Sequence, residues 1–139
     1  MYSIIVCAHG DLAESFKRSA EMIFGKTDKF YPVRFVPGEN LEDIKKKISA
    51  VISQNNLTDV LILADLFCGS PYNAAAAIAF DRQSVEVVSG VNLSIILEAV
   101  SGQNTSTLAE IVAHIKKIAP DTVKSFRDVL AAQESEESL

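Results

Sequence analysis

The chain has 139 residues, which is the usual size of one domain, and 48% of them are hydrophobic. That share is enough to form a buried core and too high for a disordered protein. The 13 basic residues against 18 acidic ones give a net charge of -5. This balance offers no electrostatic attraction to nucleic acid or to an anionic membrane, so we expect neither as a partner.

Two cysteines, Cys7 and Cys68, are too few for a disulfide framework and suit a reducing compartment. The first apolar run, residues 4–8, is too short for a secretory signal and follows no basic segment. No apolar stretch approaches the roughly 20 residues that a membrane helix needs. These features predict a cytoplasmic protein.

Short apolar runs rich in β-branched residues alternate with amphipathic segments along the chain. The runs predict strands at residues 3–8, 30–36, 59–66 and 85–91. Helical periodicity follows each of them, at residues 12–24, 41–53, from 70 onward, and 93–100, with one further helix at 108–118. We expect a single domain over residues 1–130 and a polar, acidic tail over 131–139.

Residues that favour helix starts support these boundaries. Asp11 and Glu14 have the spacing of a capping box, and Ser70 with Pro71 suits the N-cap and the first helical position. Two asparagines suited to capping precede the helices at 41 and 93, namely Asn40 and Asn92.

Alternating strands and helices indicate an α/β fold with a parallel sheet and right-handed crossovers. Pro32 lacks an N–H group, which places the second strand at a sheet edge. The doubly wound order 2-1-3-4 satisfies this condition, with helices on both faces in three layers. Ligands of such sheets bind at the carboxyl ends of the strands where the order reverses, here between strands 1 and 3.

The residues at this switch point favour phosphoryl chemistry. Strand 1 ends at His9 and strand 3 ends at Asp65, on neighbouring strands. The carboxylate can fix the imidazole tautomer and leave the other ring nitrogen nucleophilic. Beside them, Gly69 and Ser70 open a helix whose amides and dipole suit an anion such as phosphate. We also expect Gly10 to help bind the phosphoryl group.

Four stretches of the sequence form a distinctive combination: His9-Gly10-Asp11-Leu12-Ala13, Phe35-Val36-Pro37-Gly38-Glu39-Asn40, Asp65-Leu66-Phe67-Cys68-Gly69-Ser70-Pro71-Tyr72-Asn73 and Gly90-Val91-Asn92. In this order they resemble the IIA component of the mannose-type sugar phosphotransferase system (PTS), and the similarity covers about residues 2–120.

The resemblance implies that His9 accepts a phosphoryl group from phospho-HPr and passes it to the IIB component. IIB then phosphorylates sugar during uptake through the membrane subunits IIC and IID, so the chain meets those subunits only indirectly. The resemblance also implies a homodimer with an antiparallel C-terminal strand exchanged between subunits. No metal or organic cofactor is implied, because the phosphohistidine is itself the activated group.

The chain departs from the family pattern at three positions. Cys68 stands where glycine is usual, and Leu66 replaces a threonine of some members, which removes a possible hydroxyl contact to phosphate. Ser94 replaces a frequent proline after Gly90-Val91-Asn92. Three residues are candidates for a docking surface: Phe67, Tyr72 and Asn92. For the two aromatic residues, ordinary packing is the alternative.

Other functional classes fit the residues less well. A receiver phosphorylated on Asp65 needs an acidic pair at the end of strand 1, where this chain has Cys7-Ala8-His9. A metal site from Cys7, His9, Asp65 and Cys68 lacks the paired spacing of zinc motifs. A flavin module needs a phosphate-binding run after strand 1. The phosphotransfer subunit of dihydroxyacetone kinases shares the fold and the histidine and stays as the main alternative.

The C-terminal segment around residues 122–130 is the only one without an assigned place. It suits a short strand or a helical turn, and Val123 and Phe126 can anchor it. The fourth strand has an apolar outer edge without proline, which invites pairing. We therefore expect a homodimer in which these segments cross to the partner's fourth strand by two-fold symmetry.

Overall fold

The computed structural model describes residues 1–137, and strands and helices alternate along them as the apolar pattern predicts. The strands are β1 (Ser3–His9), β2 (Phe30–Phe35), β3 (Val60–Ala64) and β4 (Val85–Ser89). The helices are α1 (Leu12–Phe24), α2 (Leu41–Gln54), α3 (Ser70–Asp81), α4 (Leu93–Ser101), α5 (Leu108–Ile118) and α6 (Phe126–Glu137), with the 3-10 turn η1 (Ala119–Thr122) before α6.

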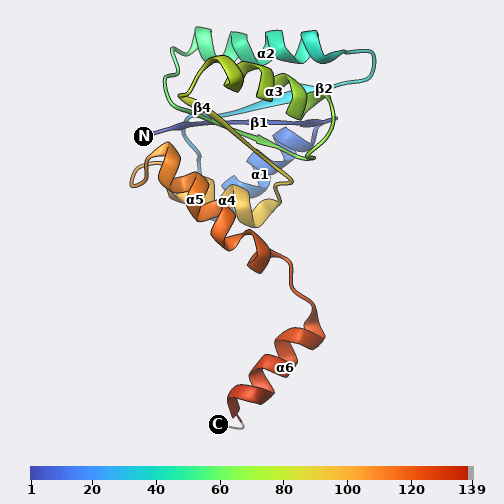
Figure 1. The fold of residues 1–139 in the computed structure, drawn as a ribbon, viewed down its shortest axis with the longest axis vertical. Coiled ribbons are helices and arrows are strands. Elements are labelled where there is room, and N and C mark those ends of the chain that lie inside the picture. The colour runs from blue at the N-terminus through green and yellow to red at the C-terminus, as the bar shows by residue number, and fades with distance from the viewer. Residues whose placement is uncertain (138–139) are drawn as a thin grey trace.

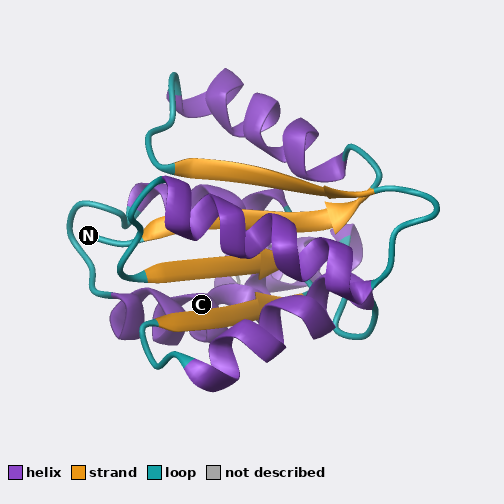
Figure 2. Cartoon of the chain, turned by 90° about the horizontal axis from the view of Figure 1, so that it is seen from above, coloured by secondary structure: helices purple, strands orange, loops and turns teal. Residues whose placement is uncertain are grey.

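The sheet has the predicted order β2-β1-β3-β4, and every strand pair in it is parallel (Figure 2). The strand that contains Pro32 lies at one edge, as its missing N–H group predicts, and β4 lies at the other. At the carboxyl end of the sheet, His9 is in register with Phe35 of β2. The α/β fold and its strand order are therefore confirmed.

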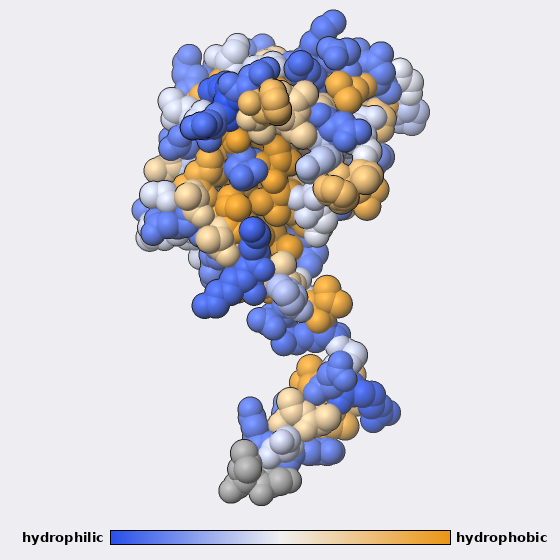
Figure 3. Space-filling model, in the orientation of Figure 1, coloured by the Kyte–Doolittle hydropathy of each residue, from blue (hydrophilic) through white to orange (hydrophobic). Residues whose placement is uncertain are grey.

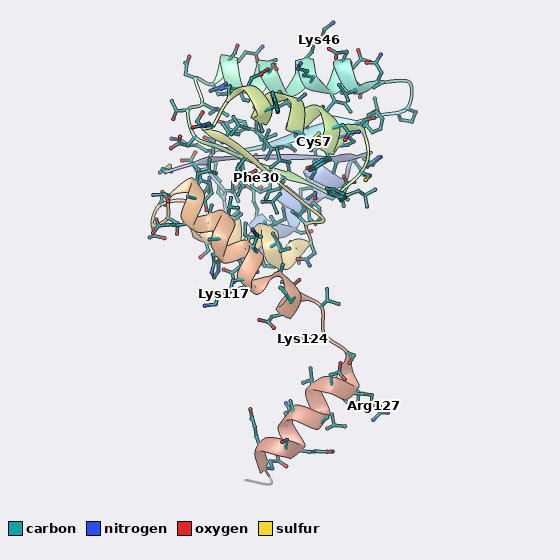
Figure 4. All side chains as sticks on the ribbon, in the orientation of Figure 1. Cys7, Phe30, Lys46, Lys117, Lys124 and Arg127 are labelled. Carbon is teal, nitrogen blue, oxygen red and sulfur yellow. The ribbon has the colours of Figure 1, made fainter. Side chains whose placement is uncertain are left out.

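Helices α2 and α3 cover one face of the sheet, and α1, α4 and α5 cover the other (Figure 1). Successive residues of β1 point to opposite faces, so Val6 joins the core on the α1 side, while Cys7 joins the core under α2 and α3. Figure 4 shows Cys7 in that second layer. By the same alternation, the side chain of His9 leaves the strand on the α2–α3 side.

Two of the predicted helix caps are confirmed. The side chain of Asn40 accepts from the backbone N–H of Asp43, and the carboxylate of Asp43 accepts from the N–H of Asn40, which completes a capping box. The side chain of Asn92 accepts from the N–H of Ile95 at the start of α4.

The capping box predicted for Asp11 and Glu14 is wrong. Asp11 makes no side-chain cap bond, and its φ of -101° with ψ of 15° is not the extended conformation of a capping residue. Glu14 instead accepts two hydrogen bonds of 2.7 Å from the guanidinium of Arg34 on β2. Such a two-fold, charge-assisted contact outweighs a single backbone bond at an exposed helix end.

The start of α3 also differs from the prediction by one residue. Gly69 is the N-cap, Ser70 is the first helical residue, and Pro71 is the second. The reason is the backbone of Gly69, whose φ of 130° lies in a region that glycine tolerates and other residues rarely adopt.

The C-terminal segment forms a helix in place of the expected antiparallel strand. Within residues 1–137 no strand follows β4; the chain passes through η1 into α6, which projects away from the body (Figure 1). No residue of α6 is buried. A strand needs a neighbouring edge for its backbone groups, whereas a helix pairs them internally, so a segment without a partner forms a helix more readily.

Helix α6 continues across the boundary expected at residue 130 and through most of the expected polar tail. The last two residues of that tail, 138–139, lie outside the described residues. In the part of the chain that is described, no helix is both long and apolar enough to cross a bilayer.

Candidate functional site

His9 and Asp65 meet at the carboxyl edge of the sheet, where the strand order predicts their contact. Nδ1 of His9 lies 2.8 Å from Oδ2 of Asp65. The same oxygen accepts from the backbone N–H of His9 at 3.1 Å, and Oδ1 accepts from the N–H of Leu66 at 3.1 Å. Both carboxylate oxygens are therefore held by donors, and the side chain of Asp65 has little freedom to rotate.

This contact selects one form of the imidazole. An ionised carboxylate can only accept hydrogen bonds, so Nδ1 of His9 carries the proton and donates it, which leaves the lone pair on Nε2. The side chain of Asp65 is 10% exposed, whereas that of His9 is 44% exposed. The orienting group is thus nearly buried, while the imidazole is open to an incoming partner.

Phe35 contacts His9 from the other side of β1. The two ring centroids are 5.2 Å apart and the planes meet at 70°, an edge-to-face arrangement. Sequence reasoning gave Phe35 no role at the site. The signal was available in the strand order, because the last residue of an edge strand β2 must lie beside the last residue of β1.

The loop before α3 approaches the imidazole on the Nε2 side. A Cβ atom built on Gly69 would lie 3.6 Å from Cε1 and 3.9 Å from Nε2 of His9. The first backbone bond into the helix is donated by Asn73 to the carbonyl of Gly69, so the amides of Ser70 and Tyr72 precede it. The first turn of α3 carries no acidic residue. The free amides, the helix dipole and the lack of a nearby acidic side chain on this turn therefore all favour an anion beside Nε2 of His9.

The amide of Gly10, a residue expected to help bind the phosphoryl group, is used within the chain. Its N–H donates to the carbonyl of Phe35 at 2.8 Å, so this amide is already engaged. The φ of Gly10 is 61°, and the residue turns the chain from β1 into α1. Gly10 therefore ties the end of β1 to the end of β2, directly after His9.

The three residues considered for docking fall into two groups. Phe67 is 65% exposed on the rim, and its ring lies 5.1 Å from that of Tyr72. Leu66, next to Phe67, is also exposed. Asn92, in contrast, caps α4 with its oxygen and donates its amide nitrogen to Oγ1 of Thr122 at 2.8 Å. Both ends of Asn92 are used within the chain, so it does not belong to the exposed rim.

The two cysteines lie in different environments. Cys7 is buried, and burial, together with the nearby charge of Asp65, raises the pKa of its thiol to about 12. A metal-binding cysteine must lose its proton, so this environment disfavours the metal interpretation. Among residues 1–137 no three side chains of the metal-binding types gather into a possible metal site. Cys68 is exposed on the loop next to Gly69.

The sequence model of the EIIA-man family, described as the PTS system fructose IIA component, matches residues 3–116. The chain belongs to the EIIA-man family. It is 32% identical to the PTS system sorbose-specific EIIA component of Lacticaseibacillus casei, covering 98% of this chain and 99% of that protein. It is 38% identical to the sorbose-specific EIIA component of Klebsiella pneumoniae, covering 86% and 87%.

A solved structure agrees with this assignment. The mannose/sorbose-specific IIA subunit of the phosphotransferase system from Enterococcus faecalis superposes with a TM-score of 0.82 at 27% identity, covering 90% of this chain and 94% of that one. The chain is therefore a PTS IIA component of the mannose, sorbose and fructose type, a class of phosphotransferase proteins that works with HPr and IIB. The EIIA-man match favours this assignment over the receiver, flavin and dihydroxyacetone-kinase interpretations.

Proposed function

We propose that this EIIA-man protein carries a phosphoryl group on Nε2 of His9, accepting it from phospho-HPr and passing it to the IIB component. The observation that supports this most directly is the 2.8 Å contact between Nδ1 of His9 and Asp65. It leaves the lone pair on the nitrogen that faces the start of α3, and it provides a negative charge beside the ring.

The transfer conserves protons and electron pairs. The Nε2 lone pair attacks phosphorus, the bond between phosphorus and the donor atom of phospho-HPr breaks, and that atom keeps the bonding electrons. His9 then bears a phosphoryl group on Nε2 and a proton on Nδ1, so the ring is cationic. The carboxylate of Asp65 stabilises this cation. The reverse sequence at the acceptor nitrogen of IIB restores the neutral ring.

The start of α3 supports the phosphoryl oxygens. The amides of Ser70 and Tyr72, the Ser70 hydroxyl and the helix dipole favour negative charge there, and the absence of a Gly69 side chain leaves room for it. This arrangement uses side chains and amides of the chain itself, and the transfer requires no metal or organic cofactor. The membrane subunits IIC and IID act only after IIB.

The aromatic pair Phe67 and Tyr72 is the surface we assign to partner docking. The two rings contact each other on either side of Gly69 in the chain, and Phe67 is largely exposed while Tyr72 is half-buried. A partner that brings its reactive atom to Nε2 must cover this rim. Large exposed apolar side chains of this kind are typical of interface centres.

Incubation with enzyme I, HPr and labelled phosphoenolpyruvate tests the proposal. The wild-type protein should acquire label that is lost in acid and stable in base, as expected for a phosphohistidine. His9→Ala should acquire none, and His114→Ala, which removes the other histidine, should be labelled normally. Label retained by His9→Ala would refute the assignment.

A homodimer completes the proposal. Among the described residues the outer edge of β4 is unpaired, and a groove of about 510 Å³ runs beside it, lined by Leu108 and Val112 of α5 and by polar residues that include Glu86 of β4. Figure 3 shows hydrophobic residues gathered in the middle of this face. Val123 and Phe126 are exposed on the projecting C-terminal segment. Exchange of these segments between two copies would cover the edge of β4 and bury Val123 and Phe126.

A further inference from the structure

Lys47 differs from its neighbours in the run Lys45-Lys46-Lys47 of α2. By helical pattern this run belongs to the solvated face, and Lys46 does point away from the body (Figure 4). Lys47 instead donates from Nζ to the backbone carbonyl of Arg34 at 3.1 Å, and it forms an ion pair with Glu39. The pair is partly sheltered, since the side chains of Lys47 and Glu39 are 40% and 17% exposed.

Glu39 holds the same strand end from a second position. Its Oε1 accepts from the backbone N–H of Val36 at 2.9 Å. Together the two ion-paired side chains therefore bind the carbonyl of Arg34 and the amide of Val36, the residues on either side of Phe35.

These bonds lie on the open edge of β2. Phe35 turns its carbonyl toward β1, where it accepts from Gly10, and backbone groups alternate in direction along a strand. The groups of Arg34 and Val36 thus face outward, where the sheet formed by residues 1–137 has no further strand. Lys47 and Glu39 occupy the place of the missing neighbour, and Phe35 is fixed from both sides of its strand.

We propose that Lys47 and Glu39 are positioning residues for phosphoryl transfer, which act by holding the Phe35 ring against the imidazole of His9. Asp65 sets the tautomer from the β3 side, and Phe35 limits rotation of the ring from the β2 side. With both contacts in place, Nε2 stays directed at the start of α3. This inference rests on the proposed phosphorylation of His9.

The test uses ring-proton NMR of the unphosphorylated protein, because the ring current of Phe35 reports its distance and angle to His9 directly. The chain has only two histidines, so His114→Asn assigns the spectrum. Lys47→Met and Glu39→Gln should shift the His9 ring protons toward their positions in Phe35→Leu. Lys47→Arg, which keeps the charge and donors, should shift them less, and Lys46→Met should leave them unchanged.

The same variants are then compared in single-turnover transfer from phospho-HPr. Lys47→Met and Glu39→Gln should slow transfer roughly two- to fivefold, as expected from losing a partly sheltered ion pair that acts on the ring through Phe35. In Phe35→Leu the addition of Lys47→Met should cause no further slowing. Lys46→Met should transfer at the wild-type rate.

Unchanged His9 resonances in Lys47→Met and Glu39→Gln would overturn the inference, and so would additive slowing in the double variant. These outcomes are separable from failure of the proposed function. If wild-type His9 is not phosphorylated at all, the proposed function fails, whereas the NMR comparison still decides whether the pair holds Phe35 against His9.

Discussion

Replacing Asp65 by asparagine separates the carboxylate's charge from its shape. In the wild-type protein one oxygen accepts from Nδ1 and the backbone N–H of His9, and the other accepts from the N–H of Leu66. An asparagine has one oxygen and one amino group for these two positions, so a donor must face a donor in either orientation. If the amino group faces His9, it favours the tautomer with the proton on Nε2, and that nitrogen loses its lone pair.

The expected loss follows from the exposure of the pair. A hydrogen bond to a charged group contributes roughly 1.5–3 kcal/mol, and about 1.4 kcal/mol corresponds to a tenfold rate. In a serine-protease triad, where the site is enclosed, the same exchange lowers the rate about 10⁴-fold. The imidazole here is 44% exposed, so water screens part of the charge. We therefore expect Asp65→Asn to slow transfer from phospho-HPr by roughly 10- to 100-fold.

Rapid-quench measurement of a single transfer from labelled phospho-HPr tests this value, with circular dichroism as the control for folding. Nitrogen NMR of the His9 ring should show a larger share of the Nε2–H tautomer than in the wild type. A transfer rate within twofold of the wild type, with the fold intact, would show that Asp65 does not orient the ring. A tautomer balance unchanged despite slow transfer would assign the effect to charge alone.

Three further predictions use other parts of the chain. Gly69→Ala places a methyl group 3.6–3.9 Å from the His9 ring atoms at a φ of 130°, so labelling should fall more than about tenfold; near-normal labelling would contradict the proposed phosphoryl position. A thiol reagent should modify Cys68 rapidly and Cys7 only on unfolding, and a fast-reacting thiol in Cys68→Ser would argue against the buried state of Cys7. Truncation after Ala119 should give monomers or aggregates by light scattering, and a truncated protein that remains a stable dimer would rule out segment exchange.

The features that sequence predicts well here depend on near neighbours. Asn40 and Asn92 cap their helices through bonds to residues three positions away, and the missing N–H of Pro32 is a property of one residue. The contact of His9 with Asp65 spans 56 positions, but it follows from strand order once Pro32 is placed at an edge. The chemistry of single residues and the order of the strands are therefore sufficient to predict these features.

The features that sequence missed depend on competition between distant groups. Glu14 was expected to cap α1, but Arg34, 20 positions away, provides a stronger partner. The helical pattern alone places Lys47 on a solvated face, but the open edge of β2 presents a carbonyl within its reach. The sequence also gives no sign that the amide of Gly10 bonds to the carbonyl of Phe35. In each case the residue bonds to a group from another element of the fold. The periodicity of the sequence holds no information about such contacts.

The position of His9 at the end of β1 has a reason in this topology. In the order β2-β1-β3-β4, β1 is flanked by β2 and β3, and the carboxyl ends of both flanking strands lie beside its own. One flank presents Asp65 to Nδ1, and the other presents the ring of Phe35. A histidine at the end of β2 or β4 would have a strand on one side only. The switch point therefore gives His9 two opposed contacts while leaving Nε2 open, which is what the proposed carrier role requires.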